Sequence, residues 1–337
     1  MYDFNKPEDA YKVSRLCNRG GVTADFPPYV TFELIDDCNF TCRMCHVSYR
    51  RKSKTEMEFG LFQKCLDDIA KYGSLVRFIG YCEPFMYSKI RDAITNVKKK
   101  KLQLHITTNG SLLDRPMIDF ILASKIDCVI FSFQGFTAEE FCFMRKVSRA
   151  VYNKVTDNIR SLFEMRVSDK PFIRVTTTIT DRDDPADRHG FVERHSKYAD
   201  EVQVTGTTHF VTLETLFSVR NIMKQSNVKA PKKAAAARCF IPNYEMKISE
   251  NGDVYICCSA ITDDLLIGNA REDSLYNLWH SEKSVNIRKT LSDGHLERFR
   301  ECSACSARYE YEDTGNALTD TVSGNVDKYG KAIMKTA

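Results

Sequence analysis

The sequence predicts an α/β fold, with six strand–helix units that form one parallel sheet and a smaller domain after them. Between residues 29 and 209, runs of apolar, β-branched and aromatic residues alternate with segments of helical apolar spacing. A second group of cysteines begins at Cys239, beyond this alternation. Strands that alternate with helices imply a parallel sheet with right-handed crossovers. The chain of 337 residues is long enough for one large domain and a smaller one.

The individual elements can be placed in chain order. Strands are expected at residues 29–37, 75–84, 102–110, 127–135, 171–180 and 201–209. Helices are expected at residues 57–73, 89–101, 116–125, within 150–167, and at 186–199. Gly73 is a C-terminal stop signal, and Pro116 suits the first turn of its helix. Six units are fewer than the eight of a closed barrel.

Polar side chains occupy one face of several predicted strands. Arg77, His105, Arg174 and Gln203 each alternate with apolar neighbours. Because helices cover the outside of a parallel sheet, outward-facing polar stripes would be costly. We therefore expect these faces to point inward and to line a lumen that accepts a hydroxyl-rich substrate. Arg174 and His105 are candidate catalytic side chains of this lumen.

The composition limits the classes of partner and compartment. A net charge of +4 does not by itself indicate a nucleic-acid partner. No apolar run has transmembrane length, and the N-terminus lacks the profile of a signal peptide. In such a chain, thirteen cysteines are more typical of metal ligands and buried thiols than of disulfides. We expect a cytoplasmic protein with no membrane or nucleic-acid partner.

Three cysteines follow the first predicted strand with the spacing C-x3-C-x2-C, namely Cys38, Cys42 and Cys45. Thiolates spaced this closely suit a [4Fe–4S] cluster, for which cysteine is the usual ligand. Three ligands leave one iron open, as a three-ligand catalytic metal site keeps one position free. A structural zinc knuckle is the alternative interpretation.

This cysteine motif, with apolar Met44 before its last cysteine, resembles that of the radical S-adenosylmethionine (SAM) superfamily. The partial (β/α)6, TIM-like barrel of that family matches the six predicted units. The resemblance implies that the open iron binds the amine and carboxylate of SAM. It further implies reductive cleavage of SAM to methionine and a 5′-deoxyadenosyl radical, which abstracts hydrogen from a substrate. An electron donor of the flavodoxin or ferredoxin type is implied as well.

The resemblance also implies residues that bind the methionine part of SAM. The family's second strand ends in a Gly-Gly-Glu type motif, and the matching run here is Gly80-Tyr81-Cys82-Glu83. Glu83 would hold the cationic amine, whereas Tyr81-Cys82 replaces the central glycine. Cys82 is in addition a candidate catalytic thiol, because a weak S–H bond makes a thiol a natural hydrogen donor.

Further cofactor contacts implied by the resemblance lie at the ends of the third and fourth strands and just beyond. Asn109 closes the third strand, and Ser132 ends the fourth. Gln134 is expected on the same strand face as Ser132, where it serves equally well as a strand-end cap. Arg145 would pair with the SAM carboxylate, and charge assistance makes such a pair strong.

The second cysteine set has the spacing C-x12-G-x4-C followed by C-x2-C, formed by Cys239, Cys257, Cys302 and Cys305. Together with the run GNAREDSLYNLW, it resembles the twitch domain, a small α+β domain that is the shortened form of the SPASM extension. Four thiolates can ligate one auxiliary [4Fe–4S] cluster completely. A four-thiolate zinc site is the alternative, and Cys258 is an alternative ligand to Cys257.

These features divide the chain into an N-terminal segment (1–28), a barrel (29–223), a linker (224–238), an auxiliary cluster domain (239–312) and a tail (313–337). We predict a dehydrogenase-type oxidoreductase with two [4Fe–4S] clusters and SAM. Its substrate would be a sugar, an aminocyclitol or a nucleotide-linked sugar, oxidised through the auxiliary cluster. The alternative is oxidation, cross-linking or epimerisation of a ribosomally made peptide. This alternative is disfavoured because such enzymes often carry a separate N-terminal peptide-recognition domain. The roughly 28 residues before the first strand are too few for one.

Overall fold

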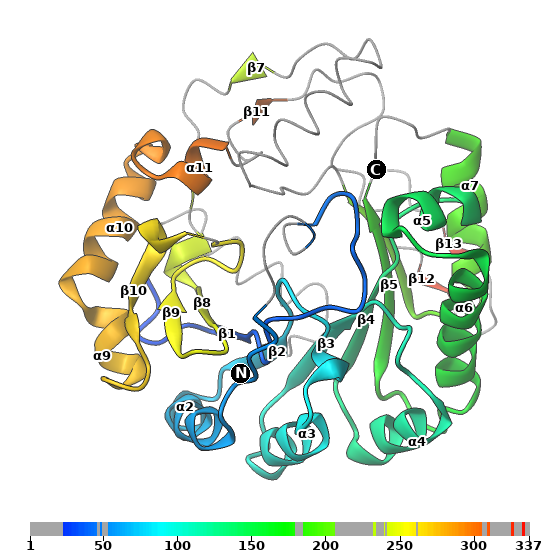
Figure 1. The fold of residues 1–337 in the computed structure, drawn as a ribbon, viewed down its shortest axis with the longest axis horizontal. Coiled ribbons are helices and arrows are strands. Elements are labelled where there is room, and N and C mark those ends of the chain that lie inside the picture. Colours follow the sequence, from blue (N-terminus) through cyan, green and yellow to red (C-terminus); the bar gives the residue numbers. More distant parts are fainter. Residues whose placement is uncertain are drawn as a thin grey trace.

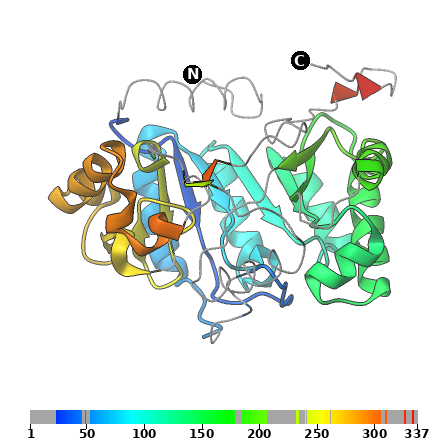
Figure 2. The ribbon, with the colours of Figure 1, turned by 90° about the horizontal axis from the view of Figure 1, so that it is seen from above.

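A computed structural model of the chain describes residues 23–45, 48, 53–178, 185–205, 232–233, 239, 241–260, 262–304, 309–310, 325–326 and 332–333. Its main feature is a nine-stranded sheet in the order β10-β9-β8-β1-β2-β3-β4-β5-β6. Helices lie along the outside of this curved sheet (Figure 1). The C-terminal helices and the β5–α7 region lie at opposite ends of the molecule (Figure 2).

The parallel part of the sheet confirms the predicted order of six strands. Each of β1 to β5 pairs in parallel with the next strand along the chain, and β6 is the last strand of the series. Their bounds are Tyr29–Phe32, Leu75–Phe78, Leu104–Thr108, Cys128–Ser132, Phe172–Thr178 and Glu201–Thr205. The first four end before the predicted limits, and hydrogen bonds to neighbouring segments are one cause. The Asn109 amide, for example, donates to the Glu83 carboxylate at 2.8 Å instead of extending the ladder.

Six helices belong to this part of the fold, and the predicted five are among them. Their bounds are Phe59–Tyr72 (α2), Ile90–Lys99 (α3), Arg115–Ser124 (α4), Ala138–Arg145 (α5), Arg149–Glu164 (α6) and Pro185–His195 (α7). Gly73 ends α2 in the left-handed conformation, as its stop signal predicted. The sequence interpretation missed α5, although Thr137 and Glu140 form a capping box at its start.

The two faces of the parallel sheet differ as expected. On β2, Val76 and Phe78 are fully buried, and they belong to one core with helix residues such as Phe62 and Ile94. Arg77, between them, faces the other side, and its side chain is 24% exposed. The polar faces therefore point away from the helices and into the lumen, which confirms the predicted orientation.

The C-terminal strands continue the same sheet instead of forming a separate one. Strand β8 (Glu245–Ile248) pairs in parallel with β1, and β9 (Asp253–Tyr255) and β10 (Leu266–Asn269) follow antiparallel. The helices of this region are Leu275–His280 (α9), Glu282–Ser292 (α10) and Arg300–Ala304 (α11). As a result, β1, which leads into the first cysteine loop, lies between β2 and the strands of the C-terminal region.

Short 3-10 helices and two small strand pairs complete the described fold. The 3-10 helices are Pro84–Met86 (η2), Ile241–Asn243 (η3), Asp263–Leu265 (η4) and Leu296–Arg298 (η5). The strand pairs are Lys232–Lys233 (β7) with Tyr309–Glu310 (β11), and Asn325–Val326 (β12) with Ala332–Ile333 (β13). Most of the predicted linker and tail, and most of the N-terminal segment, lie outside the described residues.

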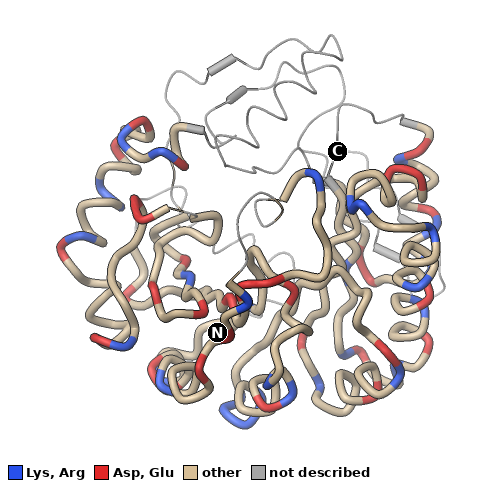
Figure 3. The backbone as a smooth tube through the Cα atoms, viewed as in Figure 1, with Lys and Arg blue, Asp and Glu red and all other residues tan. Residues whose placement is uncertain are grey.

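Charged residues of both signs occur along the outer helices. Lysines and arginines alternate with acidic residues along the outer helices (Figure 3). Within the described part of the chain, no helix has the length and hydropathy needed to cross a membrane.

Candidate active site

The loop after β1 holds Cys38, Cys42 and Cys45 in a compact conformation. Asp37 accepts the Cys38 amide through Oδ1 at 2.7 Å, and the Cys45 amide donates to the Cys42 carbonyl at 3.1 Å. The Arg43 amide donates to the Met144 carbonyl at 2.8 Å and so attaches the loop to α5. The predicted strand-end loop therefore exists and is supported by the helix that the sequence interpretation missed.

Two side chains donate hydrogen bonds to sulfur atoms of this loop. Asn109 Nδ2 lies 3.8 Å from Cys38 Sγ, and Arg145 Nη1 lies 3.4 Å from Cys42 Sγ. Burial raises the pKa of the Cys38 thiol to about 12, and binding of a metal would favour the thiolate. Hydrogen bonds to cysteine sulfur are among the factors that set iron–sulfur potentials. Met44 is half-buried and packs against the core, as an apolar residue before the last cysteine should.

The donor set of this loop suits an iron–sulfur cluster. In a [4Fe–4S] cube each thiolate bonds a different iron, so the three sulfur atoms need not meet at one point. Three thiols on one short loop, two of them with hydrogen-bond donors, satisfy that requirement.

Glu83 is a buried carboxylate beside this loop. It is 1% exposed and accepts hydrogen bonds from Thr108 Oγ1 at 2.7 Å, the Asn109 amide at 2.8 Å and the Phe85 amide at 3.3 Å. Burial raises the pKa of this carboxyl, although those hydrogen bonds partly oppose the shift. Among the described residues, no cation forms an ion pair with Glu83. Since buried charges are normally paired, the site suits a ligand with a cationic group.

Arg145 is the complementary buried cation. It is 7% exposed and donates to the Phe133 carbonyl and to Ser132 Oγ, each at 3.1 Å. No carboxylate in the described part of the chain pairs with it. The structure thus brings together Arg145, Ser132 and the cysteine loop. An unpaired guanidinium and an unpaired carboxylate near one loop suit a zwitterionic amino-acid group, such as the methionine part of SAM.

Asn109 has a structural position between the cysteine loop and the turn that follows β3. Its Oδ1 accepts the Ser111 amide at 2.9 Å and the Ser111 hydroxyl at 2.7 Å. Its Nδ2 donates to Asn39 Oδ1 at 2.8 Å as well as to Cys38. Asn109, the predicted cofactor contact, therefore lies at the expected rim of the barrel. Its side-chain amide is hydrogen-bonded to the cysteine loop.

The expected strand position of Gln134 is wrong. Strand β4 ends at Ser132, and Gln134 has a φ of 63°, in the left-handed region. The ladder stops because the next amide, of Gly135, donates to the Thr177 hydroxyl at 3.0 Å instead of to a backbone carbonyl. Gln134 is 9% exposed and forms the turn that leads toward α5.

The run Gly80-Tyr81-Cys82-Glu83 packs tightly against Glu33. A Cβ atom on Gly80 would lie 2.2 Å from Glu33 Cγ, so only glycine fits there. Burial raises the pKa of the Cys82 thiol well above its usual value, and the nearby negative groups Glu33 and Glu83 add to the shift. Cys82 is therefore a protonated thiol, which its candidate role as a hydrogen donor requires.

The lumen contains charged side chains in pairs. Arg174 Nε donates to Glu201 Oε2 at 2.7 Å across β5 and β6. Arg77 on β2 forms an ion pair with Glu245 on β8. The sequence interpretation missed both carboxylates, although Glu245 alternates with apolar positions in the same way as the residues it recognised. These two ion pairs give the inner face of the sheet a balanced charge.

His105 and Gln203 lie on the same lumen faces as these pairs. Burial lowers the pKa of His105 to about 3, and the neighbouring Arg174 and Arg77 add to this effect. His105 is consequently neutral at physiological pH. Gln203 is half-buried on β6, beside Thr176 of β5. Both residues have the polarity that a hydroxyl-bearing ligand requires.

The second cysteine set is only partly described. Cys257 and Cys258 follow β9, and Cys239 lies close enough for its charge to raise the pKa of Cys257. The hydrogen bond between Cys257 and Cys258 lowers the pKa of Cys258 to about 6. Cys302 is buried on α11, and Cys305 lies outside the described residues.

Helix α11 is connected to the segment that follows the Cys257 turn. Glu301 Oε1 accepts the Thr262 amide at 2.7 Å and the Thr262 hydroxyl at 2.6 Å. This contact joins the helix that carries Cys302 to the segment after the other cysteines. Together with Cys305, which lies outside the described residues, these thiols would provide the four ligands that a fully ligated cluster requires.

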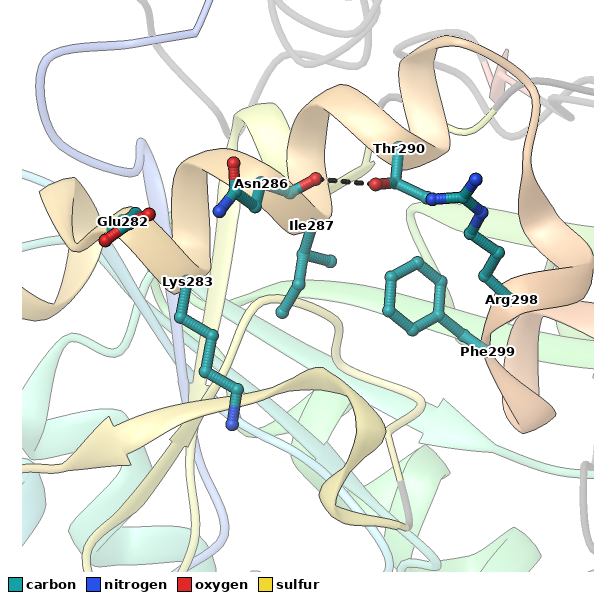
Figure 4. A pocket seen from close by; sticks show the side chains of 7 residues that line it. All are labelled: Glu282, Lys283, Asn286, Ile287, Thr290, Arg298 and Phe299. Atoms are coloured by element: carbon teal, nitrogen blue, oxygen red, sulfur yellow. Dashed lines mark hydrogen bonds between the residues drawn. The ribbon is translucent and has the colours of Figure 1, made fainter.

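A surface hollow lies between α10 and the Arg298–Phe299 segment that precedes α11 (Figure 4). It has a volume of about 470 Å³ and is lined by Glu282, Lys283, Asn286, Ile287, Thr290, Arg298 and Phe299 (Figure 4). Its charged groups have both signs, and the Thr290 hydroxyl bonds to the Asn286 carbonyl of its own helix. The chemistry of the chain is concentrated at the lumen and the cysteine loops instead.

A partial parallel barrel with three thiols on its first loop defines the radical SAM class, and comparison with known families agrees. Residues 32–194 match the Radical SAM superfamily, and residues 239–306 match the SPASM iron–sulfur cluster-binding domain. The chain belongs to the radical SAM superfamily and carries a C-terminal SPASM-type domain. The first domain implies a [4Fe–4S] cluster with SAM, and the second implies an auxiliary iron–sulfur cluster.

Particular relatives differ in the chemistry that their names state. The tungsten-containing aldehyde ferredoxin oxidoreductase cofactor-modifying protein of Pyrococcus furiosus is 30% identical over 158 residues, which cover 45% of this chain and 44% of that protein. The SAM-dependent 2-deoxy-scyllo-inosamine dehydrogenase of Niallia circulans is 20% identical over 285 residues, 82% of this chain and 92% of that protein.

A solved structure extends the fold comparison. Streptococcus suis SuiB bound to its precursor peptide SuiA matches with a TM-score of 0.62 and 15% identity, covering 92% of this chain and 81% of that one. At this identity the match supports the shared fold alone.

Proposed function

We propose that this enzyme oxidises a small polar molecule, such as a sugar, an aminocyclitol or a nucleotide-linked sugar. The observation that carries the proposal is the arrangement around the lumen. An unpaired buried carboxylate, Glu83, and an unpaired buried guanidinium, Arg145, lie beside the first cysteine loop. The charge pairs of Arg174 and Arg77 lie deeper in the same lumen.

The residues of the first loop and its rim would bind the cofactors. Cys38, Cys42 and Cys45 would ligate the first cluster, while Glu83 and Arg145 would hold the amine and carboxylate of SAM. When bound, SAM and the first cluster would supply the hydrogen-abstracting radical, and an auxiliary cluster held by the second cysteine set would supply an acceptor for the second electron. Ser132 would orient Arg145, whose Nη2 donates to the Ser132 hydroxyl at 3.1 Å.

The lumen residues would recognise the substrate. A hydroxyl or amine could add a hydrogen bond to the Arg174–Glu201 pair while the pair stays intact, so that neither charge would be left unpaired. His105 is neutral, so its ring accepts or donates a hydrogen bond without adding charge. A wall of this kind is suited to several hydroxyl groups and poorly suited to an apolar side chain.

Mass spectrometry of reactions in deuterium oxide tests this proposal. A panel of aminocyclitols, sugars and precursor peptides is incubated with reconstituted enzyme, SAM and reductant. We expect a small-molecule product two hydrogens lighter, with no carbon-bound deuterium. A product of unchanged constitution with one carbon-bound deuterium, lost in Cys82→Ala or Cys258→Ala, would instead establish epimerisation. The Cys65→Ala variant, which removes a core thiol of α2, controls for loss of a cysteine elsewhere.

Modification restricted to peptides would contradict the proposal in favour of the alternative. The precursor peptide bound to SuiB is the reason to include peptides in the panel. The inosamine dehydrogenase, which aligns over 92% of its length, is the reason to include aminocyclitols.

A further inference from the structure

Lys247 on β8 is a buried cation at the junction of the two cysteine regions. Its side chain is 3% exposed and forms an ion pair with Glu33 Oε2 at 3.1 Å. Its Nζ also donates a hydrogen bond to the Ala260 carbonyl. The rings of Tyr255 and Tyr81 flank it, with centroids 4.8 and 5.6 Å from Nζ. The ammonium is thus fully held by groups of this chain.

One side of this junction belongs to the first cysteine loop and the SAM-binding run. Glu33 directly follows β1, and its Oε1 accepts the Tyr81 amide at 2.6 Å. The absence of a side chain at Gly80 makes this contact possible, since a Cβ atom there would overlap Glu33. The partner of Lys247 is therefore fixed by the same run that contains Glu83.

The other side belongs to the turn that carries the auxiliary cysteines. The Ala260 amide donates to the Cys257 carbonyl at 3.2 Å, so the carbonyl that Lys247 binds is part of the Cys257–Ala260 turn. The Tyr81 hydroxyl donates to the Ser259 carbonyl of this turn at 3.2 Å. Two contacts from the lumen side therefore hold the Cys257 turn in place.

Neither of the simpler roles for Lys247 accounts for these features. A buried ion pair contributes little net stability, because desolvation offsets the attraction and an apolar side chain often does as well. A lysine that binds substrate must be accessible, whereas this side chain is 3% exposed. What remains is an ammonium group held beside the turn of Cys257 by Glu33 and the Ala260 carbonyl.

We propose that Lys247 raises the reduction potential of the auxiliary cluster and so prepares that cluster to accept an electron. The inference rests on the proposed auxiliary cluster at Cys257. A cluster with four thiolates becomes more negative when it is reduced, and a nearby cation in a dry environment stabilises the more negative state. Glu33 fixes the ammonium and partly balances its charge.

The test is an anaerobic redox titration of the reconstituted full-length enzyme, followed by electron paramagnetic resonance. The first cluster is recognised by the change of its spectrum when SAM is added. We expect Lys247→Met to weaken electron binding at the auxiliary cluster by about tenfold or more, a drop of about 59 mV for a one-electron couple. Lys247→Arg should keep the potential near the wild-type value. Lys283→Met, which removes an exposed charge on α10, is the matched control.

A second variant distinguishes an electrostatic role of the Lys247–Glu33 pair from a merely structural one. Glu33→Gln removes the compensating negative charge, so we expect the auxiliary potential to rise, opposite in sign to Lys247→Met. A merely structural role of the pair would shift both variants in the same direction. If the reduction potential of the auxiliary cluster is unchanged in Lys247→Met at full iron content, this inference is wrong and the proposed function is unaffected. Absence of the auxiliary cluster in the wild-type protein would overturn the proposed function and this inference together.

Discussion

The two cysteine regions of this chain are assembled in different ways. Cys38, Cys42 and Cys45 lie on one loop of eight residues, whereas the second set is spread from Cys239 to Cys305. The first loop closes on itself through backbone hydrogen bonds. The second depends on how β9 and α11 pack. The contrast shows that local spacing alone predicts the first site, and that the second requires the sheet to bring distant segments together.

The charges around the two regions differ as well. Near the first loop, Glu83 and Arg145 are buried, and no described residue forms an ion pair with either. Near the second, Lys247 is paired with Glu33. The first region is therefore suited to receive a charged ligand, and the second to hold a closed centre whose charge environment is already complete.

The largest expected effect separates the two regions by activity. The triple variant Cys38→Ala, Cys42→Ala, Cys45→Ala should lose all SAM cleavage, because no thiolate of the first cluster remains. Chromatographic measurement of 5′-deoxyadenosine checks this. The paired variant Cys257→Ala, Cys302→Ala should still cleave SAM but form no oxidised product. If both variants lose cleavage equally, the assignment of different roles to the two regions is wrong.

A smaller effect concerns the unpaired charges of the first region. Glu83→Ala and Arg145→Ala should each weaken SAM binding by about 1.5–3 kcal/mol, the usual loss for a charge-assisted hydrogen bond. Isothermal titration calorimetry measures the affinity, and circular dichroism verifies the fold. Glu301→Gln, which alters another buried carboxylate on α11, should leave SAM affinity unchanged. Unchanged affinity in both alanine variants would show that SAM binds elsewhere.

The smallest expected effect is a loss of folding stability at acid pH, which should arise from buried histidines of the barrel. Burial lowers the pKa of His105 and of His195 to about 3. The unfolded chain therefore binds more protons between the ordinary value of about 6.5 and about 3, and stability falls as the pH drops through that window. Each histidine should contribute a slope of about 1.4 kcal/mol per pH unit. His280 and His295 of the C-terminal region are 39% and 52% exposed.

Denaturant unfolding at several pH values between 4 and 7 measures this slope. His105→Gln should reduce the slope of the unfolding free energy against pH by the contribution of one histidine. His295→Gln should leave this slope unchanged. An equal effect of the two substitutions would contradict the assignment of acid sensitivity to the barrel.

Much of this organisation could be predicted from the sequence, for reasons that particular residues make clear. Strand–helix alternation is a local property, so the six parallel strands and five of their helices were recognised. The short helix α5 was missed because its eight residues show little apolar periodicity, although the Thr137 capping box was a usable signal. Gln134 was misplaced because the Gly135 amide donates to the Thr177 hydroxyl, on another strand, and so ends β4 early.

The partners of the lumen charges could not be predicted in the same way. Glu201 meets Arg174 only because β5 and β6 are neighbours in a given register. Lys247 reaches Glu33 only because β8 pairs with β1, which joins the C-terminal region to the barrel sheet. These contacts depend on long-range pairing, which the spacing of residues along the chain does not specify.

The central claim is that the two regions hold two clusters of the same type, and metal analysis of the anaerobically reconstituted wild-type protein tests it most directly. Two [4Fe–4S] clusters require about eight irons and eight sulfides per chain, and no zinc. Mössbauer spectroscopy should assign all of that iron to [4Fe–4S] centres. About four irons per chain, with one zinc retained by the C-terminal cysteines, would contradict the account.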